Sequence, residues 1–507
     1  MQQEEENLKD PCGEEKEGEE EEDEERKKGS VWCGCICIPV HWFKMLSREM
    51  HWSFVFGVII VYGVSQGLGG GLSGVGTKYY MKDVQKVQPS QAQVYAGITS
   101  IPWIVKPLWG LLTDVLPILG YRRRPYFIFA GFIGVISMVL LSLHENLHIM
   151  LAILALTASS TGVAIADVTI DACVAQNSIT HPSLAADMQS LCAFSSSVGA
   201  LLGFSIGGIF VHLIGPMGVF GLMTIPSGLL ILLGFMLDEP YMPNFAYKQV
   251  NQKFVDASKS MWTTLKKDDV WKPCLYMYLS YALSLNIFEG LFYWYTDPKA
   301  GPSFSQETVG FIFSIGSVGA LLGALLYQYA LKDYAFRDLL FWTQLIYALS
   351  GMVDLIMVLR LNLKFGIPDY LFVMIVDSVA QMTTRLKWMP MLVLSAKLCP
   401  SGIEGTFFAL LMSIDNFGVL SSSWGGGLLL HLFKITRTEF HNLWLAILLR
   451  NILRITPLCL LFLVPKADPN SSILATSESL DSEVVIETSE MENNIELVSL
   501  VNNVDAM

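Results

Sequence analysis

The chain has 507 residues, of which 52% are hydrophobic and only 16% are charged, against roughly a quarter charged in soluble globular proteins. Its formal net charge of −13 comes largely from acidic stretches near the two ends, at residues 4–25 and 466–507. The composition argues against a soluble globular protein. The acidic balance argues against nucleic-acid binding, which needs a basic face.

Long apolar runs dominate the sequence between those ends. A transmembrane helix needs about 20 apolar residues to cross a hydrocarbon core of roughly 30 Å. Twelve such runs occur, so we predict an all-α, multi-pass protein of the lipid bilayer with twelve transmembrane helices. The runs cover residues 52–72, 93–116, 125–143, 147–175, 188–213, 217–237, 273–296, 308–330, 338–359, 368–396, 405–432 and 441–464.

A polar stretch at residues 238–271 separates the sixth run from the seventh. It predicts a linker between two six-helix bundles, residues 51–237 and 272–465. The remaining residues, 1–50 and 466–507, form acidic tails that lack the apolar content needed to offset the entropy of ordering them, so we expect both tails to be disordered.

Basic residues set the predicted orientation. Lysines cluster in the linker, and arginines and lysines also occur in the loops after the second and eighth runs. Placing these segments in the cytosol satisfies the positive-inside tendency and makes the linker and both termini cytosolic. Lys78, Lys82 and Lys86 oppose this orientation, because they then fall on the outer side.

The two bundles share a weak internal similarity. His181-Pro182-Ser183 followed by Gly207-Gly208 has the same spacing as Cys399-Pro400-Ser401 followed by Gly425-Gly426. Two such halves predict parallel repeats about an axis along the membrane normal, as in major facilitator transporters. We therefore expect a major facilitator fold with two six-helix bundles.

Lys106, midway along the second run, is the first candidate functional residue. A charge against lipid costs several kcal/mol unless it faces a cavity or a partner. Lys106 shares one helical stripe with Trp103, Gly110 and Asp114. We predict that Lys106 faces a water-filled substrate site and that Trp103 offers a stacking surface there. A Lys106→Ala change is then expected to stop transport and to leave folding intact.

Acidic residues within other runs complete the predicted site. Asp167 and Asp171 lie one turn apart on one face of the fourth run, where they suit proton coupling; a structural role for Asp171 beside an arginine is the alternative. The predicted substrate-binding residues, besides Lys106 and Trp103, are Glu289, Tyr293, Asp377 and Arg385.

Two further charged residues have plainer interpretations. Lys387 lies off the Arg385 stripe near the end of the tenth run, so we expect its ammonium to snorkel to the interface. Asp354 approaches the outer end of its run, where water would solvate it.

Gly110 and Asp114, followed by the basic loop Arg122, Arg123 and Arg124, form the sharpest motif. An acid at the foot of a helix can pair with a basic loop in one conformation and release it in another. The motif resembles the gating signature of the major facilitator superfamily, with a longer spacer. We interpret these five residues as a gate latch and not as substrate ligands.

Other patterns point away from an enzyme. Residues 69–74 satisfy the spacing of a dinucleotide-binding fingerprint, but no strand precedes them, so close helix packing or a flexible end of the first helix is the better interpretation. No nucleophile–base set, metal-ligand set or phosphate-binding loop is present in the sequence. We therefore expect no catalytic residue, no metal and no cofactor.

Three segments resemble the folate–biopterin transporter family, and plant members most of all. They are Lys106–Tyr126, Asp167–Ala172 and Leu398–Ser413, and the resemblance extends over roughly residues 50–465. It implies a major facilitator fold that moves folates or pterins with protons as the coupling ion. A folate carries two carboxylates and a planar pterin, which agrees with cations beside aromatic rings.

Where single residues match the family motifs, the resemblance implies functional roles for Lys106, Asp167, Asp171 and Asp377. One departure follows Asp171, where this chain has Gln176-Asn177 in place of the Glu-Arg pair of plastid-type members. Loss of that charge pair leaves the substrate and the coupling ion open.

Several alternatives remain open at this level. The cargo of a major facilitator carrier could instead be S-adenosylmethionine or a nucleoside, and a non-transporting receptor or scaffold with signalling tails is a further possibility. We expect a monomer in the plasma membrane or an endomembrane. The acidic amino-terminal residues do not resemble a transit peptide, which argues against the plastid envelope.

Overall fold

A computed structural model describes residues 42–43, 45–241, 250–399 and 404–465. It divides into two compact units, Met1–Phe56 and Gly57–Met507, and the arrangement described below concerns the second unit. Apart from a single bridge between Ile118 and Tyr121, the regular structure of the described residues is helical.

The first half of the chain is a series of long helices. In order they are α2 (Trp52–Val58), η1 (Ile59–Leu68), α3 (Gly69–Tyr79), η2 (Tyr80–Val84), α4 (Pro89–Thr99), α5 (Ile101–Ile104), α6 (Lys106–Val115), α7 (Arg124–Leu143), α8 (Ile149–Thr180), the short turn η3 (Pro182–Leu184) and α9 (Ala185–Met236).

The second half is again a series of helices and follows a connecting helix. The elements are α10 (Val250–Leu265), α11 (Asp268–Ala282), α12 (Phe288–Tyr295), α13 (Gln306–Leu326), η5 (Tyr327–Leu331), α14 (Phe336–Val358), α15 (Leu361–Lys364), α16 (Asp369–Lys397), α17 (Glu404–Leu432), α18 (Leu443–Ile455) and η6 (Thr456–Leu463).

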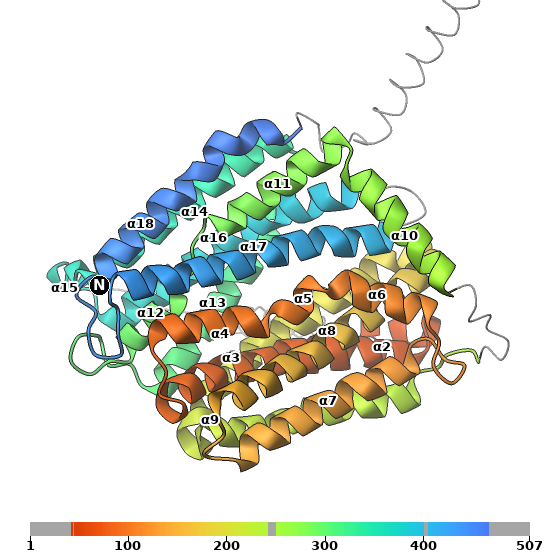
Figure 1. Ribbon diagram of the computed structural model, residues 1–507, viewed down its shortest axis with the longest axis horizontal. Coiled ribbons are helices and arrows are strands. Elements are labelled where there is room, and N and C mark those ends of the chain that lie inside the picture. Colours follow the sequence, from red (N-terminus) through yellow and green to blue (C-terminus); the bar gives the residue numbers. More distant parts are fainter. Residues whose placement is uncertain (1–41, 44, 242–249, 400–403, 466–507) are drawn as a thin grey trace, which may run out of the picture. The chain divides into compact units, whose positions relative to one another are not determined.

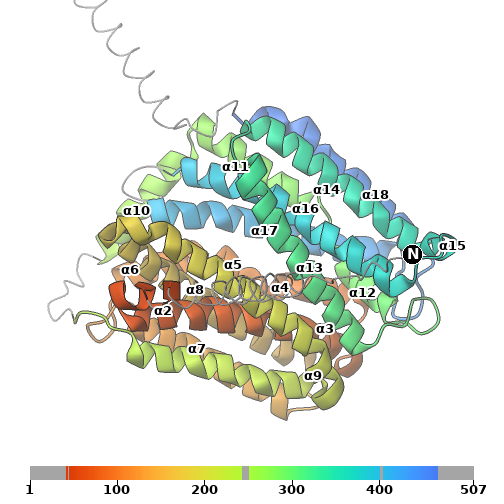
Figure 2. The ribbon, with the colours of Figure 1, turned by 180° about the vertical axis from the view of Figure 1, so that it is seen from behind.

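These helices lie in two groups. Figure 1 shows α3 to α9 together in one half of the view and α11, α14, α16, α17 and α18 in the other, with α10 at one end. The groups meet where α4 packs on α17 and where α13 packs on both α9 and α16 (Figure 2). We call the groups the N-bundle (57–236) and the C-bundle (268–463), the end that carries α10 the linker end, and the opposite end, near residues 84–89, the far end.

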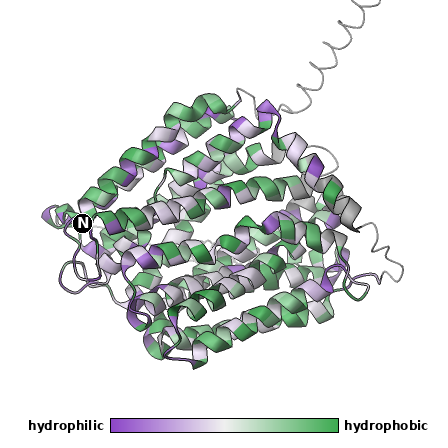
Figure 3. Cartoon of the chain, viewed as in Figure 1, coloured by the Kyte–Doolittle hydropathy of each residue, from purple (hydrophilic) through white to green (hydrophobic). Residues whose placement is uncertain are grey.

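Every predicted apolar run coincides with a helix or with consecutive helices. Of the described helices, seven are long and apolar enough to cross a membrane by length and composition, and hydrophobic residues recur along the helices in Figure 3. One of the seven, the helix ending at Met236, contains two predicted runs. It bends at Gly215, whose φ of 72° separates them. The prediction of an all-α membrane protein is confirmed.

Two predicted runs are broken inside the bundles. The second run divides into α4, α5 and α6, and the seventh divides between α11 and α12. In the second case α17 satisfies the open backbone groups, because the N–H of Asn286 donates to the carbonyl oxygen of Ser422 at 3.1 Å. The hydroxyl of Ser422 donates to the carbonyl oxygen of Ser284 at 2.9 Å. A broken helix is tolerated within a membrane protein when neighbouring helices supply such partners.

The glycine-rich segment of the first run packs closely against α9. A Cβ atom added to Gly71 would lie 2.6 Å from backbone atoms of Gly203 and Phe204, whereas one added to Gly70 meets nothing within 4 Å. Small residues at a helix interface let two backbones approach each other. The prediction of close helix packing at residues 69–74 is therefore confirmed.

This asymmetry predicts opposite effects for two neighbouring substitutions. Gly71→Ala should lower the free energy of unfolding by about 1–3 kcal/mol, because backbone atoms of α9 cannot move away as a side chain could. Gly70→Ala should leave it unchanged or raise it by up to about 1 kcal/mol, since alanine favours a helix. Thermal unfolding of both variants in detergent tests this, and equal melting temperatures would contradict the packing.

Candidate functional site

A cavity of about 500 Å³ lies among α3, α4, α8 and α12, and its lining is rich in small polar side chains. Of the described residues that line it, two are charged, one from each bundle. The polar lining consists of Ser65, Gln66, Ser73, Thr77, Lys78, Tyr95, Thr99, Ser100, Trp103, Ser159, Ser160 and Glu289.

An ion-pair network lies beside this cavity, within the N-bundle. Lys106, at the first turn of α6, forms an ion pair with Asp167 and lies 3.3 Å from a carboxylate oxygen of Asp171. The two acids project from α8 one turn apart, as their spacing predicts. Asp167 is buried, with 5% of its side chain exposed, but 45% of the Asp171 side chain is exposed. One cation therefore faces two carboxylates, and Asp171 is the more exposed of the two.

Side chains of the π-helical segment η1 complete the network. Gln66 donates to Asp167 at 2.6 Å, and the Tyr62 hydroxyl donates to Asp171. The Lys106 ammonium also lies 5.8 Å from the centre of the Trp103 ring. Gln66 and Trp103 both line the cavity, so they connect it to the charged network. The predicted pairing of Asp171 with an arginine is wrong, because its cation is a lysine of the neighbouring helix.

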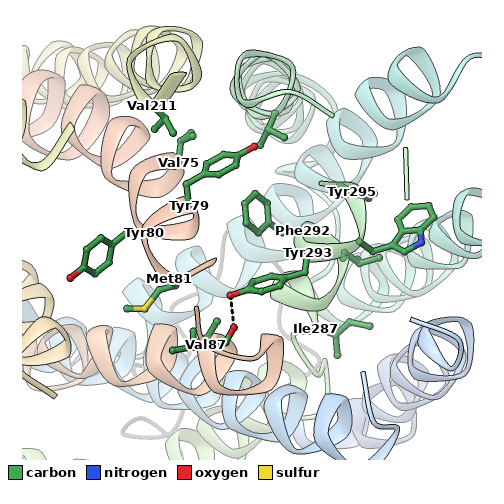
Figure 4. Packing of buried hydrophobic residues seen from close by; sticks show 14 of the residues in the cluster. Val75, Tyr79, Tyr80, Met81, Val87, Val211, Ile287, Phe292, Tyr293 and Tyr295 are labelled. Atoms are coloured by element: carbon green, nitrogen blue, oxygen red, sulfur yellow. Dashed lines mark hydrogen bonds between the residues drawn. The ribbon is translucent and has the colours of Figure 1, made fainter. Parts of the chain in front are cut away.

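Glu289 and Tyr293 of α12 lie in different environments. Glu289 lines the cavity and forms an ion pair with Lys78 of α3, on the opposite bundle. Tyr293 is 1% exposed and donates to the backbone carbonyl of Val87 at 3.1 Å, amid the aromatic packing drawn in Figure 4. The structure therefore places Glu289 at the cavity and Tyr293 in a contact between the bundles at the far end.

The two candidate residues of α16, Asp377 and Arg385, also lie in different environments. Asp377, together with Gln381, lines a second cavity of about 250 Å³ that shares Gly74 and Lys78 with the first. Arg385 lines neither cavity, and its guanidinium lies 5.0 Å from the centre of the Trp388 ring. The geometry thus brings Lys78, Glu289 and Asp377 to adjoining cavities and leaves Arg385 apart.

The basic loop at the linker end holds an acid through its backbone. A carboxylate of Glu239, just after α9, accepts from the N–H groups of Arg122 at 2.6 Å, Arg123 at 2.9 Å and Arg124 at 3.0 Å. These N–H groups form the start of α7, where a helix favours an anion. The side chain of Asp114 lies outside the described residues, so its predicted contact with this loop stays a prediction.

Glu239→Ala should lower the free energy of unfolding by about 1–2 kcal/mol, as for loss of a helix N-cap. The backbone N–H groups at the start of α7 would lose the carboxylate that satisfies them. A melting temperature measured in detergent checks this, with Glu145→Ala as the control, since Glu145 is exposed in a loop. An unchanged melting temperature for Glu239→Ala would show that water replaces the carboxylate without cost.

Comparison with known proteins bears on this arrangement. A family model described as the BT1 family matches residues 66–484. The probable folate-biopterin transporter 2 of Arabidopsis thaliana is 64% identical over 93% of this chain and 94% of its own length. The folate-biopterin transporter of Synechocystis sp. is 30% identical over 84% of each chain. The chain belongs to the folate–biopterin transporter (BT1) family.

Solved structures confirm the fold predicted for this family member. The nucleoside transporter NupG matches with a TM-score of 0.60 at 14% identity, over 81% of this chain and 96% of its own. A D-xylose-proton symporter matches with a TM-score of 0.57 at 13% identity, over 83% and 98%. At such identities the similarity concerns the fold alone, which is the major facilitator fold of a multi-pass membrane protein.

Sequence reasoning missed or misplaced several residues of this transporter. Lys78, which was not predicted to be a site residue, lines the cavity. Lys387, expected to snorkel, is 2% exposed and donates to the carbonyl oxygen of Ser280 at 2.9 Å, because α11 supplies an acceptor for its ammonium inside the C-bundle. Asp354, expected to be solvated, lies 2.7 Å from Arg450. In each case the pairing residue belongs to another helix.

Proposed function

We propose that this chain is a secondary active transporter of folates or pterins, working as a proton symporter by alternating access. The observation that carries the proposal is the cavity of the N-bundle, lined by small polar side chains and by Glu289 of the C-bundle, next to a network in which one ammonium faces two carboxylates. Its volume of about 500 Å³ falls within the range of small-molecule sites. The names of the curated relatives supply the substrate class.

Substrate binding is assigned to the residues at the cavities. Trp103 offers a flat surface for a pterin ring, and Lys106, Glu289 and Asp377 supply charge in or beside the cavities. Tyr293 and Arg385 have indirect roles in this proposal, since both contact protein groups away from the cavity lining.

Proton coupling is assigned to Asp167 and Asp171. A single ammonium cannot neutralise two carboxylates, so one negative charge remains, and a proton can neutralise it. The side chain of Asp171 is more exposed than that of Asp167. We therefore assign proton uptake and release to Asp171. Asp167 is assigned the role of the fixed ion-pair partner of Lys106.

Alternating access is proposed from the position of the contacts between the bundles. At the far end Lys78 pairs with Glu289, Tyr293 donates to Val87, and the N–H of Arg437 donates to Gln88 at 3.2 Å. With a cytosolic linker, this end faces outward, and the described state is closed to the outside. Gly110, Asp114 and the loop Arg122–Arg124 are then the gate elements at the cytosolic end.

The remaining features of the proposal follow the sequence. The bundles at residues 51–237 and 272–465 act as the two moving bodies, with the linker and both tails in the cytosol. The transporter works as a monomer in the plasma membrane or an endomembrane.

Uptake of labelled folate into proteoliposomes tests the proposal. With an acidic exterior the purified chain should accumulate folate, and collapse of the pH gradient should abolish the accumulation. A parallel panel of biopterin, a nucleoside and S-adenosylmethionine distinguishes the other carriers. Absence of uptake for every solute would support a receptor or scaffold instead, and uptake without any response to the gradient would remove the coupling.

A further inference from the structure

Lys78 occupies a position that the substrate-binding assignment leaves unexplained. It is the one cation among the described residues that line the main cavity, and it also lines the second cavity with Asp377 and Gln381. Its ammonium lies 4.5 Å from the centre of the Phe288 ring, which belongs to the second cavity. Lys78 therefore stands in the wall that both cavities share.

The carboxylate of Glu289 is already paired with the Lys78 ammonium. The two groups form an ion pair in which 18% of the Lys78 side chain and 8% of the Glu289 side chain are exposed. Glu289 is held in place from the N-bundle as well, because its backbone N–H donates to the Gln93 side chain at 3.1 Å. Breaking so buried a pair leaves an uncompensated charge, which is strongly unfavourable unless another anion replaces the lost partner.

The same pair is the contact nearest the cavity in the closure of the far end. Beyond it Tyr79 packs edge-to-face on Phe292, with ring centres 5.2 Å apart, and Tyr293 reaches Val87. Figure 4 shows these aromatic side chains filling the space between α12 and the end of the first helix. A ligand in the cavity therefore meets the ion pair first, before the apolar contacts that seal this end.

We propose that Lys78 binds a carboxylate of the transported molecule, and that Glu289 takes its place when the cavity is empty. When the substrate binds, its carboxylate replaces that of Glu289 beside the Lys78 ammonium. The positive charge of Lys78 therefore remains neutralised. The Glu289 carboxylate is thereby released from Lys78, which weakens the contact between the bundles at the far end. This inference rests on the proposed function only in requiring a substrate with a carboxylate, as folate has and biopterin lacks.

Equilibrium binding of labelled folate and biopterin to purified protein tests the exchange. Lys78→Gln should weaken folate binding by roughly tenfold or more, the size expected for a charge-assisted hydrogen bond, and should leave biopterin binding within about twofold. Lys82→Gln, one turn further along and outside both cavity linings, is the matched control and should bind both ligands normally.

The reversed pair Lys78→Glu with Glu289→Lys separates binding from structure. It should regain the melting temperature that Lys78→Gln loses, because an ion pair again joins the bundles, but it should not regain folate binding. Recovery of folate binding together with stability would overturn the inference, as would normal folate binding by Lys78→Gln, in both cases with the proposed function intact.

A measurement without ligand judges the unlocking step separately. A cysteine placed at Thr296, at the far end, should react faster with a maleimide in detergent when Glu289→Gln is also present, above the background of the native cysteines. If the parent protein binds neither folate nor biopterin, the proposed function fails. The maleimide labelling still tests whether the ion pair of Lys78 and Glu289 holds the far end closed. A labelling rate that Glu289→Gln leaves unchanged would refute this.

Discussion

Lys106→Ala is expected to abolish folate uptake and to lower the free energy of unfolding by about 3–5 kcal/mol, the range for removing one partner of a buried ion pair. Two carboxylates, those of Asp167 and Asp171, face this one ammonium, and Asp167 is only 4% exposed. The sequence alone predicts intact folding for this variant. The structure changes that expectation, since Lys106 compensates buried charge in addition to any contact with substrate.

A second substitution distinguishes the two roles of Lys106. In the Lys106→Ala background, Asp167→Asn removes the most buried uncompensated charge and should restore most of the lost stability, but not uptake. The matched control is Lys272→Ala, which breaks an exposed pair with Asp268 at 2.6 Å and should change stability by less than about 1 kcal/mol. Uptake that returns with stability would confine Lys106 to a structural role.

The fold is predictable because its main constraint is local. Each helix that crosses a bilayer must be apolar over a fixed length, and this requirement is visible in a single run of residues. Even the bend of α9 at Gly215 coincides with the gap between two runs. Charged residues within apolar runs are equally visible, which is why the sequence alone identifies Lys106, Asp167 and Glu289 as candidates.

Their partners are not predictable, because pairing depends on helices far apart in the sequence. Gln66 and Tyr62 carry no charge, so they cost little in an apolar run and leave no signal, although both bind the network. The sequence does not single out Lys78 as a site residue, because the predicted first run ends at residue 72, whereas the first helix extends through η2 to Val84. Glu239 is bound by backbone N–H groups, which no pattern of side chains encodes.

Asp171→Asn is expected to uncouple transport from the pH gradient. An amide cannot exchange a proton under these conditions, and it leaves Lys106 neutralised by Asp167 alone, so the network no longer needs a proton in either conformation. Its oxygen can still accept from the Tyr62 hydroxyl, and Asp171 is the more exposed of the two acids, so folding should be preserved. The variant should therefore lose gradient-driven accumulation of folate and retain exchange of folate across the membrane at equal pH.

Proteoliposomes loaded with unlabelled folate measure that exchange, and the same preparation with an imposed gradient measures accumulation. Asp354→Asn is the control, because Asp354 is also an intramembrane acid paired with a cation, Arg450, but belongs to the C-bundle and lines neither cavity. It should keep its response to the gradient even if its melting temperature falls. Accumulation by Asp171→Asn that still follows the gradient would move the coupling site to another acid, because a side chain that cannot take up a proton cannot link transport to one.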